Sequence, residues 1–302
     1  MRIPFRRLLF LILIFPILLG SGCQTVSPPV TTPTATASAT ISSAAQTQKS
    51  LDLTATPTIP IPACLEVHGQ VVVEQVATTF LTHPLDVRIY FPPCYSLSSS
   101  RGYPVLYMLH GQASDDGQWE RLGLLKAADE LILSGAITPM IIVMPYDISW
   151  NASPDQSTFG KALIQDLIPY IDATYNTDAD RACRAIGGLS RGGNWAVNLG
   201  FAYPELFTAI GAHSTPLFYG EVGRITTVMK TRDADKQIPS IYVDVGNKDE
   251  NLPQVMIFVD LLKEFNISYT FTQFNGYHSE EYWSAHVEDY LSWYSEEFTA
   301  GQ

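Results

Sequence analysis

The chain has 302 residues, of which 46% are hydrophobic, and it carries a formal net charge of −12. This length is ample for one well-packed domain, even after a targeting segment is set aside. A strongly acidic chain offers few cations to phosphate groups, which argues against nucleic acid and anionic lipid as partners.

Residues 1–22 have the features of an export signal. Three arginines at positions 2, 6 and 7 precede an apolar run from Leu8 to Leu19, and small residues follow at positions 20–22. The run is too short for a transmembrane helix, which needs about 20 apolar residues. We therefore interpret residues 1–22 as a signal peptide of the lipoprotein type.

Cys23 follows these small residues directly, as in a bacterial lipobox. This position predicts that Cys23 is lipidated and anchors the exported protein to the membrane, at the cell surface or on the periplasmic side. The spacing departs from the usual pattern, because Leu19 lies four residues before the cysteine rather than three. Ordinary secretion therefore stays open as the alternative.

Residues 23–61 are rich in Thr, Ser, Pro and Ala. Such a segment cannot bury enough apolar surface to offset the entropy lost on ordering. We expect it to form an extended, disordered stalk. Residues 62–302 then form the folded domain.

The first strands of the domain show an alternating pattern. Leu85, Val87 and Ile89 point to one face, while Asp86 and Arg88 point to the other. Later strands, at residues 105–109 and 140–144, are continuous apolar runs, which is typical of parallel strands that are buried on both faces.

Helical and strand patterns alternate along the rest of the domain. We predict helices at residues 119–134, 158–175 and 255–265, after Ser190 and at the C-terminus, and strands at residues 207–211, 241–245 and 269–274. This order predicts an α/β fold with a mainly parallel central sheet, antiparallel strands at its start, and helices on both faces.

A G-x-S-x-G motif places Ser190 between Gly188 and Gly192, directly after a short apolar run. A serine hydroxyl becomes a useful nucleophile when it is held exposed and a base takes its proton. A sharp strand-to-helix turn exposes the serine, and small flanking residues allow that turn. Ser190 is therefore the candidate nucleophile.

The strand at 105–109 runs directly into His110-Gly111-Gln112. Acyl-transfer enzymes hold the oxyanion of the tetrahedral intermediate with backbone N–H groups. We expect these donors to be the backbone N–H groups of Gln112 and of Arg191, which opens the helix after the nucleophile.

The candidate acid is Asp249, just past the strand at 241–245. Asp244 is a rival, although it lies within that strand. The neighbouring Glu250 could also take the role geometrically.

His278 is the candidate base, because it follows the strand at 269–274 after a short turn. His286 competes with it, but lies among apolar residues of the last helix. The chain order Ser190, Asp249, His278 is that of the α/β-hydrolases, with each residue on a loop after a late strand. The sequence thus predicts a serine hydrolase.

The cysteines and histidines do not suggest a metal site, since no Cys-x-x-Cys or His-x-x-x-His spacing occurs. We expect no cofactor. Cys64 and Cys94 flank the first two strands and could form a disulfide, which would leave Cys183 as a buried thiol. A pairing that involves Cys183 stays open.

The chain resembles the "putative esterase" (esterase D-like) family of α/β-hydrolases, which includes feruloyl esterases, S-formylglutathione hydrolases, siderophore esterases and mycolyltransferases. The likeness covers roughly residues 84–296. It is carried by residues 104–111, 166–172, 184–193 and 276–278, together with Trp283. The resemblance implies that Ser190 is the nucleophile, Asp249 the acid and His278 the base. Arg191 departs from the family, in which methionine is common at this position.

We expect an exported serine carboxylesterase that acts on small-molecule or glycan-linked esters, including feruloyl esters. His110, Gly111, Trp119, Trp150 and Tyr277 could line its substrate pocket. Two alternatives are an acyltransferase of the mycolyltransferase type and a non-catalytic surface lipoprotein that binds glycans or a protein. The sequence specifies no oligomeric state.

Overall fold

The computed structural model describes residues 65–149, 152, 154, 156–217, 219–231 and 237–300. Contacts divide the chain into Met1–Pro60 and Ile61–Gln302, and all of the described residues belong to the second unit. The predicted signal peptide and stalk, with Cys23, lie outside the described residues, as do Cys64 and Trp150.

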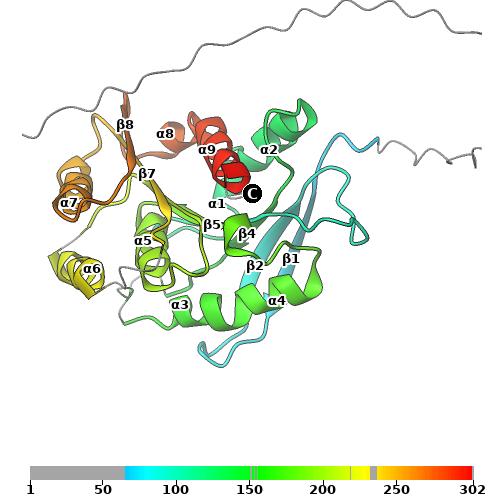
Figure 1. The fold of residues 1–302 in the computed structure, drawn as a ribbon, viewed down its shortest axis with the longest axis horizontal. Coiled ribbons are helices and arrows are strands. Elements are labelled where there is room, and N and C mark those ends of the chain that lie inside the picture. Colours follow the sequence, from blue (N-terminus) through cyan, green and yellow to red (C-terminus); the bar gives the residue numbers. More distant parts are fainter. Residues whose placement is uncertain are drawn as a thin grey trace, which may run out of the picture. The chain divides into compact units, whose positions relative to one another are not determined.

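An eight-stranded sheet forms the centre of the described domain, in the order β1-β2-β4-β3-β5-β6-β7-β8 (Figure 1). The strands are β1 (Gln70–Val76), β2 (Leu85–Phe91), β3 (Val105–Leu109), β4 (Ile141–Pro145), β5 (Arg184–Leu189), β6 (Ala209–His213), β7 (Ser240–Gly246) and β8 (Thr270–Phe274). β2 is antiparallel to β1 and β4, and every other pairing is parallel. The prediction of a mainly parallel sheet with antiparallel strands at its start is confirmed.

Helices cover both faces of the sheet (Figure 1). They are α1 (Gln118–Arg121), α2 (Leu124–Leu133), α3 (Phe159–Ala162), α4 (Ile168–Thr174), α5 (Arg191–Ala202), α6 (Tyr219–Thr231), α7 (Leu252–Glu264), α8 (Glu280–Ser284) and α9 (Val287–Ala300). Residues from α3 to α7 pack in one apolar cluster, and residues from α1, α2, α8 and α9 pack in another. Each cluster includes side chains from one face of the strands, because successive side chains point to opposite faces.

Two predicted helices are interrupted. The helix expected at 119–134 is divided into α1 and α2, because Gly123 adopts a left-handed backbone with φ of 88°. The helix expected at 158–175 contains a π-helical turn at Leu163–Leu167, after which α4 begins with Pro169 in its first turn. Helix α6 was not predicted, because the two glycines in its sequence lower its helix propensity.

Two cysteines, Cys94 and Cys183, lie within the described residues. Cys94 is disulfide-bonded, and the partner suggested by the sequence, Cys64, lies outside the described residues. Cys183 is a buried thiol before β5. Among the described helices, none is long and apolar enough to cross a membrane.

The parallel strands bring the candidate loops to one edge of the sheet. Leu109 at the end of β3 lies opposite Gly188, and Gly246 at the end of β7 lies opposite Phe274. The loops that follow these strands carry the candidate oxyanion, nucleophile, acid and base residues. In open α/β sheets, ligands bind in the crevice outside these carboxyl ends.

Candidate active site

Ser190 stands at a tight turn between β5 and α5. Its backbone has φ of 51° and ψ of −117°, a conformation that is costly for a residue with a side chain. The glycines on either side permit the turn: a Cβ at Gly188 would collide with the backbone of Gly192, and one at Gly192 would collide with the Leu109 carbonyl. The backbone N–H of Ser190 donates to the His213 carbonyl at 2.8 Å, which fixes the turn against β6.

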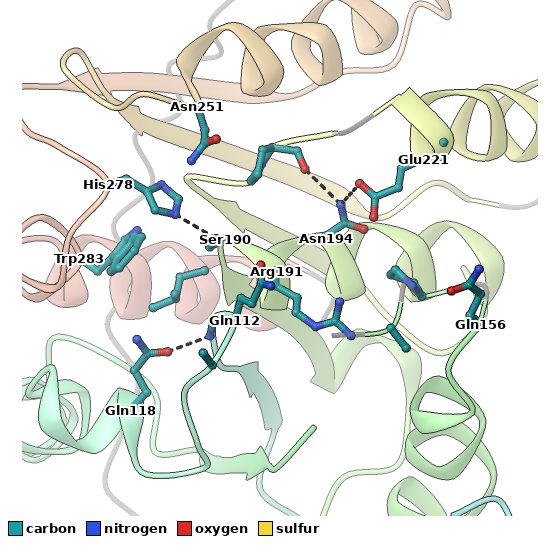
Figure 2. Close-up of a pocket in the computed structure, with 17 residues that line it drawn as sticks. Gln112, Gln118, Gln156, Ser190, Arg191, Asn194, Glu221, Asn251, His278 and Trp283 are labelled. Atoms are coloured by element: carbon teal, nitrogen blue, oxygen red, sulfur yellow. Dashed lines mark hydrogen bonds between the residues drawn. The ribbon is translucent and has the colours of Figure 1, made fainter. Parts of the chain in front are cut away.

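A hydrogen-bonded chain links the three candidate residues of the triad, and Figure 2 shows its contact between His278 and Ser190. Nε2 of His278 lies 2.9 Å from Oγ of Ser190, and Nδ1 of His278 lies 2.8 Å from Oδ2 of Asp249. A carboxylate only accepts, so Nδ1 carries the hydrogen and Nε2 is left to accept the serine proton. This arrangement can make Ser190 nucleophilic.

Contacts from two sides hold the acid and the base in place. Asp249 is 4% exposed, and its Oδ1 accepts the backbone N–H of Asn251 at 2.8 Å. The indole of Trp283 meets the His278 ring edge-on, with 4.9 Å between ring centroids and an interplanar angle of 83°. The imidazole is thereby restricted to the orientation that faces Ser190.

The loop His110–Gln112 is the candidate oxyanion loop. Both the backbone N–H and the carbonyl of Gly111 in this loop are hydrogen-bonded. Its N–H donates to Oε1 of Gln118 at 2.8 Å, and its carbonyl accepts from Nδ1 of His110 at 2.7 Å. The peptide that joins Gly111 to Gln112 is planar and trans, so a fixed carbonyl also fixes the N–H of Gln112 on the opposite side. A Cβ at Gly111 would lie 2.7 Å from Cδ1 of Leu189, so a larger residue here would require that side chain to shift.

A cleft of about 960 Å³ opens beside Ser190 and His278 (Figure 2). Gln112, Arg191 and Leu189 line it close to the serine. The other lining residues are Gly111, Ala113, Gln118, Ala152, Pro154, Gln156, Asn194, Pro216, Gly220, Glu221, Asn251 and Trp283. A cavity of this size is in the range of small-ligand sites, and side-chain amides dominate its polar lining.

The predicted pocket residues have different outcomes. Gly111 lines the cleft, whereas Trp119 does not: its side chain is 1% exposed, and its Nε1 donates to the Leu109 carbonyl beneath the oxyanion loop. His110 is also buried behind this loop. Tyr277 is 60% exposed and lies over Nζ of Lys248, outside the residues that line the cleft. Trp119, His110 and Tyr277 are therefore not among the residues that line this cleft, and position in the sequence alone does not reveal which way a side chain points.

The rival residues for acid and base lie elsewhere. Asp244 is fully buried and accepts hydrogen bonds from His213 at 2.7 Å and from Tyr282 and Tyr290. Glu250 is exposed. The ring of His286 stacks on Phe274 with 3.9 Å between centroids.

Several cleft residues were not found from the sequence. Gln118 lies on α1, Asn194 on α5, Glu221 on α6 and Asn251 at the start of α7. Nδ2 of Asn194 donates to Oε2 of Glu221 at 2.6 Å across the cleft wall. These residues come from separate elements and form no motif, so no local signal identifies them.

Within the described ranges, no group of three or more His, Cys, Asp or Glu side chains could hold a metal ion.

Known proteins resemble this chain over most of the domain. An endo-1,4-beta-xylanase/feruloyl esterase of Xylanibacter ruminicola is 33% identical over 170 residues, which is 53% of this chain and 22% of that protein. An acetyl esterase of Caldicellulosiruptor saccharolyticus is 21% identical over 230 residues, 65% of this chain and 85% of that protein. The chain thus spans only about a fifth of the xylanase/feruloyl esterase.

Solved structures share the fold. A ferulic acid esterase matches 77% of this chain and 99% of its own, with a TM-score of 0.68 and 24% identity. An S-formylglutathione hydrolase from Staphylococcus aureus matches 76% of this chain and 99% of its own, with a TM-score of 0.64 and 17% identity. These likenesses support the α/β-hydrolase fold. Because residues 78–296 match the family described as "Putative esterase", the chain belongs to that family.

Proposed function

We propose that the domain is a serine carboxylesterase that works through an acyl-enzyme. The observation that carries this proposal is the chain from Ser190 through His278 to Asp249, which ends at the cleft beside the Gly111 loop. Membership of the esterase family supports it. We assign the roles of nucleophile, base and acid to Ser190, His278 and Asp249, respectively.

In the proposed reaction, Oγ of Ser190 attacks the ester carbonyl carbon while its proton passes to Nε2 of His278. The carbonyl oxygen becomes an oxyanion held by the backbone N–H groups of Gln112 and Arg191. His278 returns the proton to the leaving alcohol oxygen, which breaks the ester bond and leaves the acyl group on Ser190. Water then repeats the attack with His278 as base, and the carboxylic acid leaves.

The composition of the cleft supports a carbohydrate-linked ester as substrate. Its wall carries the amides of Gln112, Gln156 and Asn251, which can donate to and accept from hydroxyl groups. Relatives include a protein named as a feruloyl esterase and one named as an acetyl esterase. We infer that acetyl or feruloyl groups on sugars are hydrolysed.

The location of the enzyme is inferred from residues 1–61. We propose that residues 1–22 direct export, that Cys23 carries the lipid anchor, and that residues 23–61 hold the esterase domain, residues 62–302, away from the membrane. Secretion without an anchor is the alternative.

Replacement of the nucleophile tests the function directly. We expect Ser190→Ala to lower kcat for p-nitrophenyl acetate by about 10⁴-fold or more, because no other group supplies the attacking oxygen. A fluorophosphonate probe should label the wild type and leave Ser190→Ala unlabelled. The exposed Ser134→Ala, at the end of α2, is the control and should behave as the wild type. Equal turnover or labelling of wild type and Ser190→Ala would contradict the proposal.

The assignment of the acid can be tested with adjacent carboxylates. We expect Asp249→Asn to lower kcat by about 10³- to 10⁴-fold, because an amide can present N–H to Nδ1 and favour the wrong histidine tautomer. Glu250→Gln should leave kcat unchanged, since Glu250 is exposed and the His278 ring bonds to Asp249 instead. Steady-state kinetics of the two variants decide whether Asp249 or Glu250 is the acid. A large loss of kcat in Glu250→Gln, with kcat of Asp249→Asn unchanged, would assign the role to Glu250.

Substrate preference separates a carbohydrate esterase from a general one. We expect kcat/KM for acetylated or feruloylated oligosaccharides to exceed that for the ethyl ester of the same acid by about tenfold or more, about 1.4 kcal/mol of extra transition-state binding. Equal values would argue against recognition of the sugar.

Product analysis in the presence of sugar acceptors would detect acyl transfer in place of hydrolysis.

The anchor can be tested in bacteria that express the full chain with its own leader. We expect the wild type to sediment with membranes and to incorporate labelled palmitate, and Cys23→Ser to appear in the soluble exported fraction without label. A wild type that is soluble and unlabelled would instead indicate ordinary secretion.

A further inference from the structure

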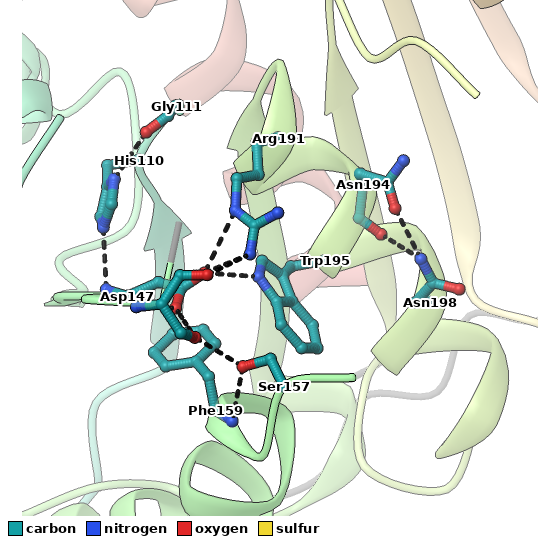
Figure 3. A network of polar contacts seen from close by, with 10 residues as sticks. His110, Gly111, Asp147, Ser157, Phe159, Arg191, Asn194, Trp195 and Asn198 are labelled. Carbon is teal, nitrogen blue, oxygen red and sulfur yellow. Dashed lines mark hydrogen bonds and ion pairs between the residues drawn. The ribbon is translucent and has the colours of Figure 1, made fainter. Parts of the chain in front are cut away.

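Arg191, the residue that departs from its family, forms a buried ion pair with Asp147 (Figure 3). Its Nε and Nη2 atoms lie 3.2 and 2.9 Å from Oδ2 of Asp147. Nη2 also donates to the Ser149 carbonyl at 3.1 Å. The two charged side chains are only 13% and 5% exposed. This contact joins the first residue of α5 to the loop after β4.

Asp147 is held by further donors. Its Oδ2 accepts from Nε1 of Trp195 at 2.9 Å, and its Oδ1 accepts the N–H and the hydroxyl of Ser149 at 3.0 and 2.6 Å. A buried carboxylate needs this degree of compensation, because an unpaired charge would be costly. The ion pair therefore has a defined geometry rather than that of a mobile surface contact.

The backbone of Asp147 continues the network to the oxyanion loop. Its N–H donates to Nε2 of His110 at 2.8 Å, while Nδ1 of His110 lies 2.7 Å from the Gly111 carbonyl. An N–H only donates and a carbonyl only accepts, so His110 must be the neutral tautomer with its hydrogen on Nδ1. Burial lowers the pKa of His110, which is consistent with the neutral form.

Asp147 contacts both Arg191 and His110 (Figure 3), and through these two residues it connects the expected oxyanion donors. On one side its carboxylate holds Arg191, whose backbone N–H is one donor. On the other side its N–H holds His110, which orients the Gly111 carbonyl and hence the N–H of Gln112.

We propose that Asp147 and Arg191 are positioning residues, which fix the backbone N–H groups of Gln112 and Arg191 relative to each other so that both can donate to one oxyanion. In this proposal the Arg191 side chain positions a donor and does not bind substrate. This inference rests on the proposed esterase function. It gives the Arg191 side chain a role that a methionine at that position could not fill.

Asp147→Asn and Arg191→Met each disrupt the pair without removing either backbone donor. Complete loss of one oxyanion donor costs about 10²- to 10³-fold in kcat. We expect misalignment to cost less, about 10- to 100-fold in kcat for p-nitrophenyl acetate, with KM changed by no more than about threefold. Affinity for a trifluoromethyl ketone, whose tetrahedral adduct places an oxyanion in the same site, should fall by a similar factor. Fluorophosphonate titration counts the competent sites, so that any misfolded fraction is excluded.

The ion pair of Arg184 with Asp172 supplies a matched control. Nη2 of Arg184 lies 2.7 Å from Oδ2 of Asp172, with side-chain exposures of 4% and 21%, at the opposite end of β5 from Ser190. We expect Asp172→Asn to lower Tm but to leave kcat per titrated site and ketone affinity unchanged.

Several results would overturn the inference. If Asp147→Asn and Arg191→Met lower Tm but keep wild-type kcat per titrated site, the pair is only structural. If Arg191→Met raises KM for anionic esters at unchanged kcat, Arg191 binds substrate. If Asp147→Asn does not fold, Arg191→Met alone decides. If the wild type neither hydrolyses esters nor reacts with the probe, the esterase proposal fails, and this inference fails with it.

Discussion

The candidate site depends on how closely helix α5 approaches the end of strand β3. No side chain fits between Gly192 and the Leu109 carbonyl, and none fits between Gly188 and the backbone of Gly192. This close approach places Ser190 in its strained conformation and sets the N-terminus of α5 against the oxyanion loop. A helix N-terminus presents unpaired N–H groups and a partial positive charge, so the same constraint supplies electrostatic stabilisation for an anion.

Two of the Asp–His pairs among the described residues lie on or just after strands β6, β7 and β8, and their surroundings give them different properties. His213 and Asp244 lie 2.7 Å apart and are fully buried, and the ring of Tyr290 stacks on His213 at 3.7 Å. Burial and the nearby Asp244 hold the pKa of Tyr290 well above its usual range, so Tyr290 remains a hydrogen-bond donor to that carboxylate. This pair lies within the core, where its hydrogen bonds are made to other buried side chains. The other pair, His278 with Asp249, borders the cleft and faces a serine. Access to a substrate, rather than the Asp–His contact itself, distinguishes the two.

Much of this arrangement could be predicted from the sequence, because its signals are local. Strands of continuous apolar residues end where polar residues begin, and the candidate residues follow those ends at Ser190, Asp249 and His278. Because these strands are parallel, the loops after them lie at the same end of the sheet. The distances between the candidate side chains and their orientations cannot be predicted from the sequence. Trp119 illustrates the limit. It follows the oxyanion loop closely in sequence, yet its ring turns into the core and supports the loop from beneath.

Contacts between distant loops were beyond prediction for the same reason. Arg191 and Asp147 are 44 residues apart, and neither belongs to a pattern that names the other. Methionine at position 191 could pack on the Trp195 ring but could not satisfy a buried carboxylate. The presence of arginine therefore makes sense only together with Asp147. A departure from a family pattern close to a reactive group is best interpreted through the partner that the fold provides, and here that partner also holds the oxyanion loop.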